Sequence, residues 1–127
     1  MTRLRFLWRG WWSLFHCDLV LHIASFKRLH DLVHRHKLQE RDLKSTCSIG
    51  DLCHAMDLAC VFYFKRVLCL QRSAATTCLL REYGWAAEMV IGVQMLPFRS
   101  HAWVEVNGQI VNDKPYMTDI YRILKRC

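Results

Sequence analysis

The chain has 127 residues, a length that suits one domain, and 53% of them are hydrophobic and 12% aromatic. This composition predicts a globular protein and excludes the collagen-like, coiled-coil and disordered classes. The formal net charge of +7 attracts nucleic acid, anionic lipid and acidic peptides about equally well. Because the sequence has neither the glycine–aromatic signature of an RNA-recognition sheet nor zinc-finger spacing, no nucleic-acid partner is expected. A peripheral contact with a membrane surface stays open.

The chain contains seven cysteines. Its opening segment, residues 1–26, is rich in Leu, Trp and Phe. Arg9 and Asp18 interrupt this segment. Its longest run without charged residues, from Gly10 to Cys17, is far shorter than the roughly 20 residues that a membrane span needs. No small-residue cleavage site of a secretory leader follows it. We therefore expect a cytoplasmic protein with reduced thiols, most of them small buried groups.

The first two-fifths of the chain has the periodicity of helices. Apolar residues recur at three- and four-residue steps between Leu4 and Phe15, as one face of a helix requires. Residues 27–43 place a few apolar side chains among many basic and His residues, which predicts a helix with one buried and one solvated face. A turn is expected at residues 44–48.

Two further helices are expected before any strand. Ser48 can cap the first of them through its side-chain oxygen. Residues 69–83 form the second, and Gly84 is well placed to end it. Leu68 is a poor N-cap and no helix-breaking residue lies just before Cys69, so one continuous helix through this position is also compatible with the sequence.

After Gly84 the pattern changes from helix to strand. Residues 85–93 are enriched in β-forming residues, and residues 101–106 alternate between two faces. Asn107-Gly108 is a strong hairpin turn, after which residues 109–113 return along the sheet. The predicted fold class is α+β, with N-terminal helices packed against a small antiparallel sheet.

One cysteine, one histidine and one aspartate have the order of a nucleophile, a base and an orienting group. Cys69 stands at the expected start of a helix, where free N–H groups and a partial positive charge favour the thiolate. His101 on a strand can take the thiol proton, and Asp113 beyond the turn can hold the imidazole in the required tautomer. In a chain with seven Cys and seven His such a trio also arises by chance, so the spacing alone is weak support.

The other cysteines and histidines have simpler interpretations. Three cysteines are expected in the core: Cys53, Cys60 and Cys78. Cys47, Cys53 and His54 lack the second close pair that would complete a tetrahedral zinc site. His30 and His34 have metal-ligand spacing on a helix, but a solvated helical face is the more common use of such a pair. No metal or cofactor is expected.

The segment from Cys69 to Leu124 resembles the lasso-peptide leader peptidases, which are transglutaminase-like cysteine peptidases of the microcin-processing type. The resemblance rests on Cys69-Leu70 at a helix start, on the block HAWVEVNG at residues 101–108, and on the closing Asn112-Asp113 and Tyr121. It implies a transglutaminase-like, papain-like core. We expect a single folded unit in which residues 1–46 are a helical segment for cover or partner docking and residues 47–127 are the catalytic core.

The resemblance also implies an activity and its partners. Members of this family remove the leader from a ribosomally made precursor peptide, and a macrolactam-forming cyclase then closes the core peptide. Short members depend on a leader-recognition protein on a separate chain, and this chain has no spare segment for such a module. Cys69 would be the nucleophile, His101 the base and then the acid, and Asp113 the orienting group. Acyl transfer to an amine, amide hydrolysis and a non-catalytic docking role are the alternatives.

The hairpin decides whether His101 and Asp113 can meet. A strict two-residue loop that continues as a regular ladder pairs Ala102 with Asp113 and places that carboxylate on the face opposite His101. Asn112 would then be the better orienting group. A three-residue loop with a left-handed Gly108 shifts the register by one and places His101 opposite Asp113. We therefore expect an irregular hairpin at Gly108, or a compensating bulge near Asn112, with a His101 nitrogen within hydrogen-bond reach of Asp113.

Two residues on the same strand as His101 are expected to point to the same face of the sheet as His101. Trp103 is expected to pack and to shield the site, and Glu105 is expected to be exposed to solvent.

Overall fold

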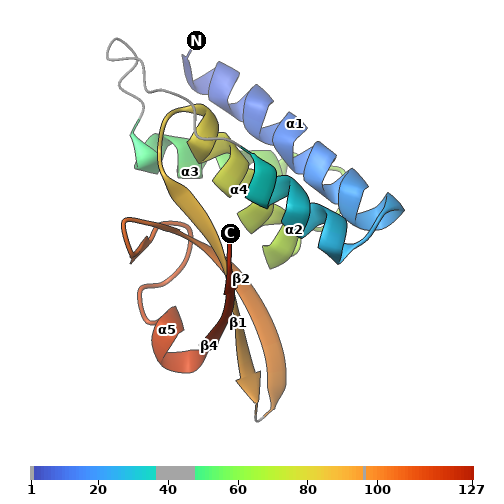
Figure 1. Ribbon diagram of the computed structural model, residues 1–127. Coiled ribbons are helices and arrows are strands. Elements are labelled where there is room, and N and C mark those ends of the chain that lie inside the picture. Colours follow the sequence, from blue (N-terminus) through green and yellow to red (C-terminus); the bar gives the residue numbers. More distant parts are fainter. Residues whose placement is uncertain (1, 37–47, 96) are drawn as a thin grey trace.

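The computed structural model describes residues 2–36, 48–95 and 97–127, and within these ranges it forms five helices and a four-stranded antiparallel sheet (Figure 1). The helices are α1 (Thr2–Ile23), α2 (Phe26–Arg35), α3 (Ile49–Val61), α4 (Cys69–Glu82) and α5 (Met117–Ile120). The strands are β1 (Ala87–Met95), β2 (Phe98–Val106), β3 (Gln109–Ile110) and β4 (Arg122–Arg126), in the order β3-β2-β1-β4. The α+β prediction is therefore confirmed. The predicted boundary between residues 46 and 47 lies outside the described residues, as does most of the turn expected at residues 44–48.

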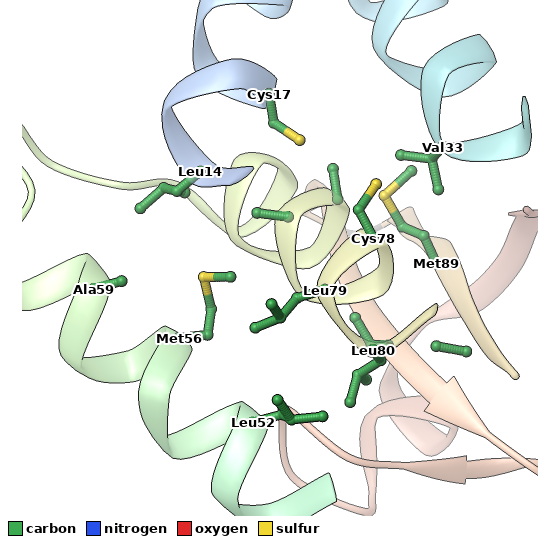
Figure 2. Close-up of a cluster of buried hydrophobic side chains, with 14 of the residues drawn as sticks. Leu14, Cys17, Val33, Leu52, Met56, Ala59, Cys78, Leu79, Leu80 and Met89 are labelled. Carbon is green, nitrogen blue, oxygen red and sulfur yellow. The ribbon is translucent and has the colours of Figure 1, made fainter. Parts of the chain in front are cut away.

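Helix α4 lies between the other helices and the sheet. Helices α1 and α3 pack against it, and it in turn contacts β1 and β2 (Figure 1). Its hydroxyl groups permit burial on all sides because each donates to a backbone carbonyl: Ser73 to Ala102, Thr76 to Arg72 and Thr77 to Ser73. The apolar core around it (Figure 2) includes Leu14, Leu52, Met56, Leu79 and Leu80. Helix α4, rather than the N-terminal helices, thus provides the main cover of the sheet.

The helix ends follow local capping rules. The Ser48 hydroxyl accepts a hydrogen bond from the Asp51 N–H at 3.1 Å, which caps α3 as predicted. Helix α3 ends at Val61 and α4 begins at Cys69, so the alternative of one continuous helix is wrong. Gly84 adopts a left-handed conformation, with φ of 86°, just after α4, as expected for a residue that ends a helix.

A buried carboxylate on α1 holds the segment that leads into α4. Asp18 accepts hydrogen bonds from the Tyr63 hydroxyl at 2.8 Å and from the Gln71 carboxamide at 3.4 Å, and Lys65 Nζ lies 3.1 Å from it. Burial favours a higher pKa for Asp18, but these donors outweigh burial and lower its pKa below the usual value. Since Leu68 provides no side-chain cap for α4, these contacts fix the beginning of that helix from outside it.

The hairpin between β2 and β3 has a regular two-residue turn. Asn107 and Gly108 have φ of 53° and 78°, and Val106 pairs with Gln109 across them. The expectation of a three-residue loop with a bulge at Gly108 is therefore wrong. Asn and Gly both tolerate the left-handed conformation that a type I′ turn requires at its two central positions, so the shorter loop costs little. Strand β3 then ends at Ile110.

The sheet face that points away from α4 is lined with aromatic rings. Trp103 is fully buried there, and its ring centroid lies 6.2 Å from that of Tyr121, the residue just before β4. Gly92 lies beneath them, and a Cβ atom at this position would stand 2.7 Å from both Trp103 and Tyr121. Glycine is therefore required here by space rather than by conformation. The prediction that Trp103 packs is confirmed.

Replacement of Asp18 by Asn tests whether the buried carboxylate stabilises the fold. We expect a loss of about 1–3 kcal/mol in the free energy of unfolding at pH 7, because the neutral amide cannot replace a carboxylate with three donors. A carboxyl group whose folded pKa is lowered stabilises the fold above its unfolded pKa of roughly 4, and this contribution is lost as the pH falls. The difference in the free energy of unfolding between wild type and D18N, measured by urea unfolding, should therefore become smaller at acid pH.

The exposed Asp57 provides the matched control. It is paired with Arg72 at the surface. Asp57→Asn should change stability by no more than about 1 kcal/mol, because exposed ion pairs contribute little. Equal losses in the two variants would contradict the role given to Asp18.

Candidate active site

The imidazole of His101 and the carboxylate of Asp113 are in direct contact. His101 Nε2 lies 2.5 Å from Asp113 Oδ2, and both side chains are about three-quarters buried. The imidazole also stacks on Tyr121, with ring centroids 5.4 Å apart and planes 26° from parallel. The contact expected from the sequence is thus present, and the ring of Tyr121 limits how far the imidazole can turn.

A side chain, rather than a loop insertion, brings Asp113 to His101. The Val111 N–H donates to the Val104 carbonyl at 2.9 Å, as the ladder of β2 and β3 would continue. The Val104 N–H, however, donates to Asn112 Oδ1 at 2.7 Å, in the place where a strand partner would offer its carbonyl. The chain leaves the ladder at this point, and Asp113 passes to the face of His101. The irregularity therefore lies near Asn112, the second of the two positions predicted for it.

Cys69 is the first residue of α4 and is half-buried. One turn later, Ser73 donates to the carbonyl of Ala102, the neighbour of His101, and accepts from Asn112 Nδ2 at 3.3 Å. The start of α4 is therefore tied both to β2 beside His101 and to the segment that carries Asp113. The hydrogen bonds among the described residues include none between Cys69 and His101, so the structure joins two of the three candidate residues directly.

The sequence did not reveal the carboxylate that anchors Trp103. Glu105 is only 3% exposed, which makes the expectation of an exposed Glu105 wrong. It accepts a hydrogen bond from Trp103 Nε1 at 2.9 Å, and Arg126 on β4 donates to it at 2.9 Å. A buried charge is stable when it is paired in this way, and the pairing fixes the Trp103 ring beneath the imidazole. Strand β4 was not predicted, so its arginine could not be foreseen.

The other cysteines divide into buried and half-buried groups. Cys78 is buried as predicted, whereas Cys53 and Cys60 are only half-buried, and Cys47 lies outside the described residues. Burial raises the pKa of Cys53 to about 11, so this thiol stays protonated at neutral pH. In residues 2–36, 48–95 and 97–127, no group of three or more His, Cys, Asp or Glu residues is arranged to hold a metal ion.

Replacement of Asn112 by Ala tests the origin of the His101–Asp113 contact. The change leaves the partly buried Val104 N–H without its acceptor, which should cost about 1–3 kcal/mol of unfolding free energy. It should also release Asp113 from His101, because the Asn112 side chain ties this part of the chain to both Val104 and Ser73. NMR of the His101 ring protons would detect the change.

The exposed neighbour Lys114 is the control, since the hydrogen bonds and ion pairs of the described residues include none made by its side chain. An unchanged His101 spectrum in N112A would show that Asn112 does not position Asp113.

Comparison with known proteins identifies the family of the chain. The family model described as the transglutaminase-like superfamily matches residues 13–126, which include the second half of α1, the other helices and the whole sheet. The microcin J25-processing protein McjB of Escherichia coli is 49% identical over 51 residues, which are 40% of this chain and 24% of that protein. The match thus spans about a quarter of the relative's length. No solved structure matches the chain. None of the helices in the described ranges has the length and apolar character needed to cross a membrane.

Proposed function

We propose that this chain, which belongs to the transglutaminase-like superfamily, is a cysteine peptidase that removes the leader from a lasso-peptide precursor. The observation that carries the proposal is the contact of His101 with Asp113 beside the helix that begins at Cys69. The sequence identity with a microcin-processing protein supports a precursor peptide as the substrate. The reaction would take place in the cytoplasm, where the precursor is made.

In this mechanism Asp113 orients the base. A carboxylate that accepts from the Nε2–H of His101 leaves the lone pair on Nδ1, and in the proposed mechanism this nitrogen takes the proton from the Cys69 thiol. The thiolate attacks the scissile carbonyl, and the protonated His101 then gives its proton to the departing amine of the core peptide. Water hydrolyses the resulting thioester and frees the leader.

The start of α4 offers the first donor for the oxyanion. The N–H of a first helical residue has no carbonyl four residues earlier to bond, so the Cys69 N–H can bind the negative oxygen of the tetrahedral intermediate. The helix dipole adds partial positive charge at the same point and favours the thiolate. Both effects depend on α4 beginning at residue 69.

Helix α1 has the surface expected of a docking segment. Its inward side chains join the core, but its outward side is also apolar and remains exposed. Exposed residues on it include Leu4, Trp8, Trp12, Leu19 and Ile23. Exposed aromatic residues in one patch are typical of protein interfaces. We assign this stripe to the leader-recognition protein, which would present the precursor to the peptidase before the macrolactam-forming cyclase acts.

Replacement of Cys69 by Ala should abolish leader removal without loss of the fold, because the half-buried thiol would act as the nucleophile and not as a core group. The measurement is mass spectrometry of a precursor peptide incubated with the chain and its leader-recognition protein. Cys53→Ala, on α3, is the matched control and should cleave at the wild-type rate. Cleavage by C69A at that rate would refute the mechanism, and a mass increase of the precursor would indicate acyl transfer instead.

If Asp113 orients His101, its replacement should reduce the cleavage rate in the same assay without abolishing it. Asp113→Asn should keep some activity, reduced by roughly 10²- to 10⁴-fold, because the nucleophile and base remain but the tautomer is no longer fixed. Asp119→Asn, in the neighbouring helix α5, should have no effect. Full activity in D113N would remove Asp113 from the catalytic residues.

The docking role predicts dependence on the partner. The purified chain should cleave the precursor weakly, and the leader-recognition protein should stimulate it strongly by raising the local concentration of substrate. Trp8→Ala should weaken that stimulation by about tenfold or more and leave the unstimulated rate unchanged, because Trp is a frequent binding hot spot. Phe62→Ala, also exposed but outside α1, is the control. Full-rate cleavage by the purified chain alone would contradict this prediction.

A further inference from the structure

A second cluster of thiol and imidazole groups lies on the helical side of the molecule. Cys17 on α1, Cys78 on α4 and His36 after α2 line a cavity of about 580 Å³, together with Glu82. None of the three candidate catalytic residues lines it. The cluster is therefore separate from the site described above.

Small side chains bring α1 and α4 close together beside the two cysteines. Ser13 on α1 donates to the carbonyl of Ala75 on α4 at 3.3 Å, and Gly10 on α1 lies close to Leu79 on α4. Figure 2 shows the sulfur atoms of Cys17 and Cys78 directed into the space between α1, α2 and α4. A disulfide needs the two Cα atoms within about 4.4–6.8 Å, a separation that such close helix contacts favour.

The surroundings of the two thiols shift their pKa values in opposite directions. Interaction with Cys17, followed by that with His36, lowers the pKa of Cys78 well below the ordinary value of a thiol, although burial acts in the opposite direction. The pKa of Cys17 is raised instead, because its interaction with Cys78 and its burial both favour the protonated thiol. His36 is held with its Nε2 3.5 Å from Glu82. The surroundings thus favour the thiolate form of Cys78 and the thiol form of Cys17.

The position of Cys78 in its helix excludes a second peptidase site. Cys78 is the tenth of the fourteen residues of α4, where backbone N–H groups are bonded within the helix. It therefore has no free N–H to stabilise an oxyanion, unlike Cys69. A thiolate beside a second thiol is suited to disulfide chemistry instead.

We propose that Cys17 and Cys78 form a reversible disulfide when a small hydroperoxide enters the cavity. The Cys78 thiolate attacks the terminal oxygen of the hydroperoxide, its sulfur is oxidised to a sulfenic acid, and the O–O bond breaks; the other oxygen leaves as alkoxide, or as hydroxide if the oxidant is hydrogen peroxide, and takes a proton to become an alcohol or water. The Cys17 thiol then attacks the sulfenic sulfur, the S–S bond forms, and the sulfenic hydroxyl group leaves with the thiol proton as water. A dithiol reductant restores the two thiols. This chemistry does not use Cys69 and does not depend on the proposed peptidase activity.

The disulfide would join the docking helix to the helix that carries the nucleophile. It closes a loop from residue 17 to residue 78 and restricts the unfolded chain, so the oxidised protein should be more stable than the reduced one. An oxidant would then act on the stability of the helical layer through two cysteines that are not part of the proposed catalytic triad.

The test uses the full chain with Cys69→Ala, so that reaction of Cys69 cannot be confused with the cluster. The protein is treated with hydrogen peroxide, remaining thiols are blocked with N-ethylmaleimide in denaturant, and the unreduced digest is analysed by mass spectrometry. We expect the linked Cys17–Cys78 peptide as the predominant cross-linked species, a higher midpoint of thermal unfolding, and reversal of both by dithiothreitol. Recovery of Cys17 and Cys78 as blocked thiols, while other cysteines are oxidised, would overturn the proposal.

Single variants separate the role of Cys78, which reacts with the peroxide, from that of Cys17, which attacks the sulfenic acid. Cys17→Ser should leave a sulfenic acid on Cys78 that dimedone traps, whereas Cys78→Ser should give neither a dimedone adduct at Cys17 nor a linked peptide. Cys53→Ser, the matched control, should give the same linked peptide as the parent. A dimedone adduct at Cys17 in the Cys78→Ser protein would reverse the order of attack and overturn the scheme. Peptide mapping of the parent decides the proposal by itself if a variant does not fold.

Discussion

The candidate site depends on where α4 begins, and a single buried carboxylate fixes that point. Helix α4 has no side-chain cap, so its first turn lacks the local signal that normally starts a helix. Asp18 replaces this signal from a distance, since it binds Tyr63 and Lys65 before the helix and Gln71 within it. The carboxylate tolerates burial because its donors compensate for the loss of water. The free N–H of Cys69 and the tie from Ser73 to β2 both follow from this anchor.

What could be predicted from the sequence was determined by residues close to one another along the chain. The cap at Ser48, the end of α4 at Gly84 and the turn at Asn107-Gly108 each depend on a few consecutive residues, whose conformational preferences are strong. The start of a helix at Cys69 came from the family resemblance rather than from capping, because the residues before it are equally suited to a helix.

What could not be predicted depends on contacts between distant residues. The length of β3 is set by Asn112, whose side chain takes the place of a strand partner, and no sequence pattern distinguishes such an asparagine from one at the surface. The same carboxamide reaches Ser73, 39 positions earlier. Glu105 was placed in solvent because a carboxylate on a strand is usually exposed. Its burial requires Arg126 from a strand that pairs only with β1.

Strand β4 also bears on how the molecule behaves in solution. It is the last strand of the order β3-β2-β1-β4, so its outer backbone groups are available to a strand of another molecule. All five of its residues are exposed, and three of them are basic; Arg126 is paired with Glu88 and Glu105, which leaves Arg122 and Lys125 as the charges that face a second copy. A second copy adding its own β4 would bring like charges together, and this repulsion protects the edge from aggregation. The protection is electrostatic, so it weakens in concentrated salt, where charges are screened beyond about 3 Å at 1 M.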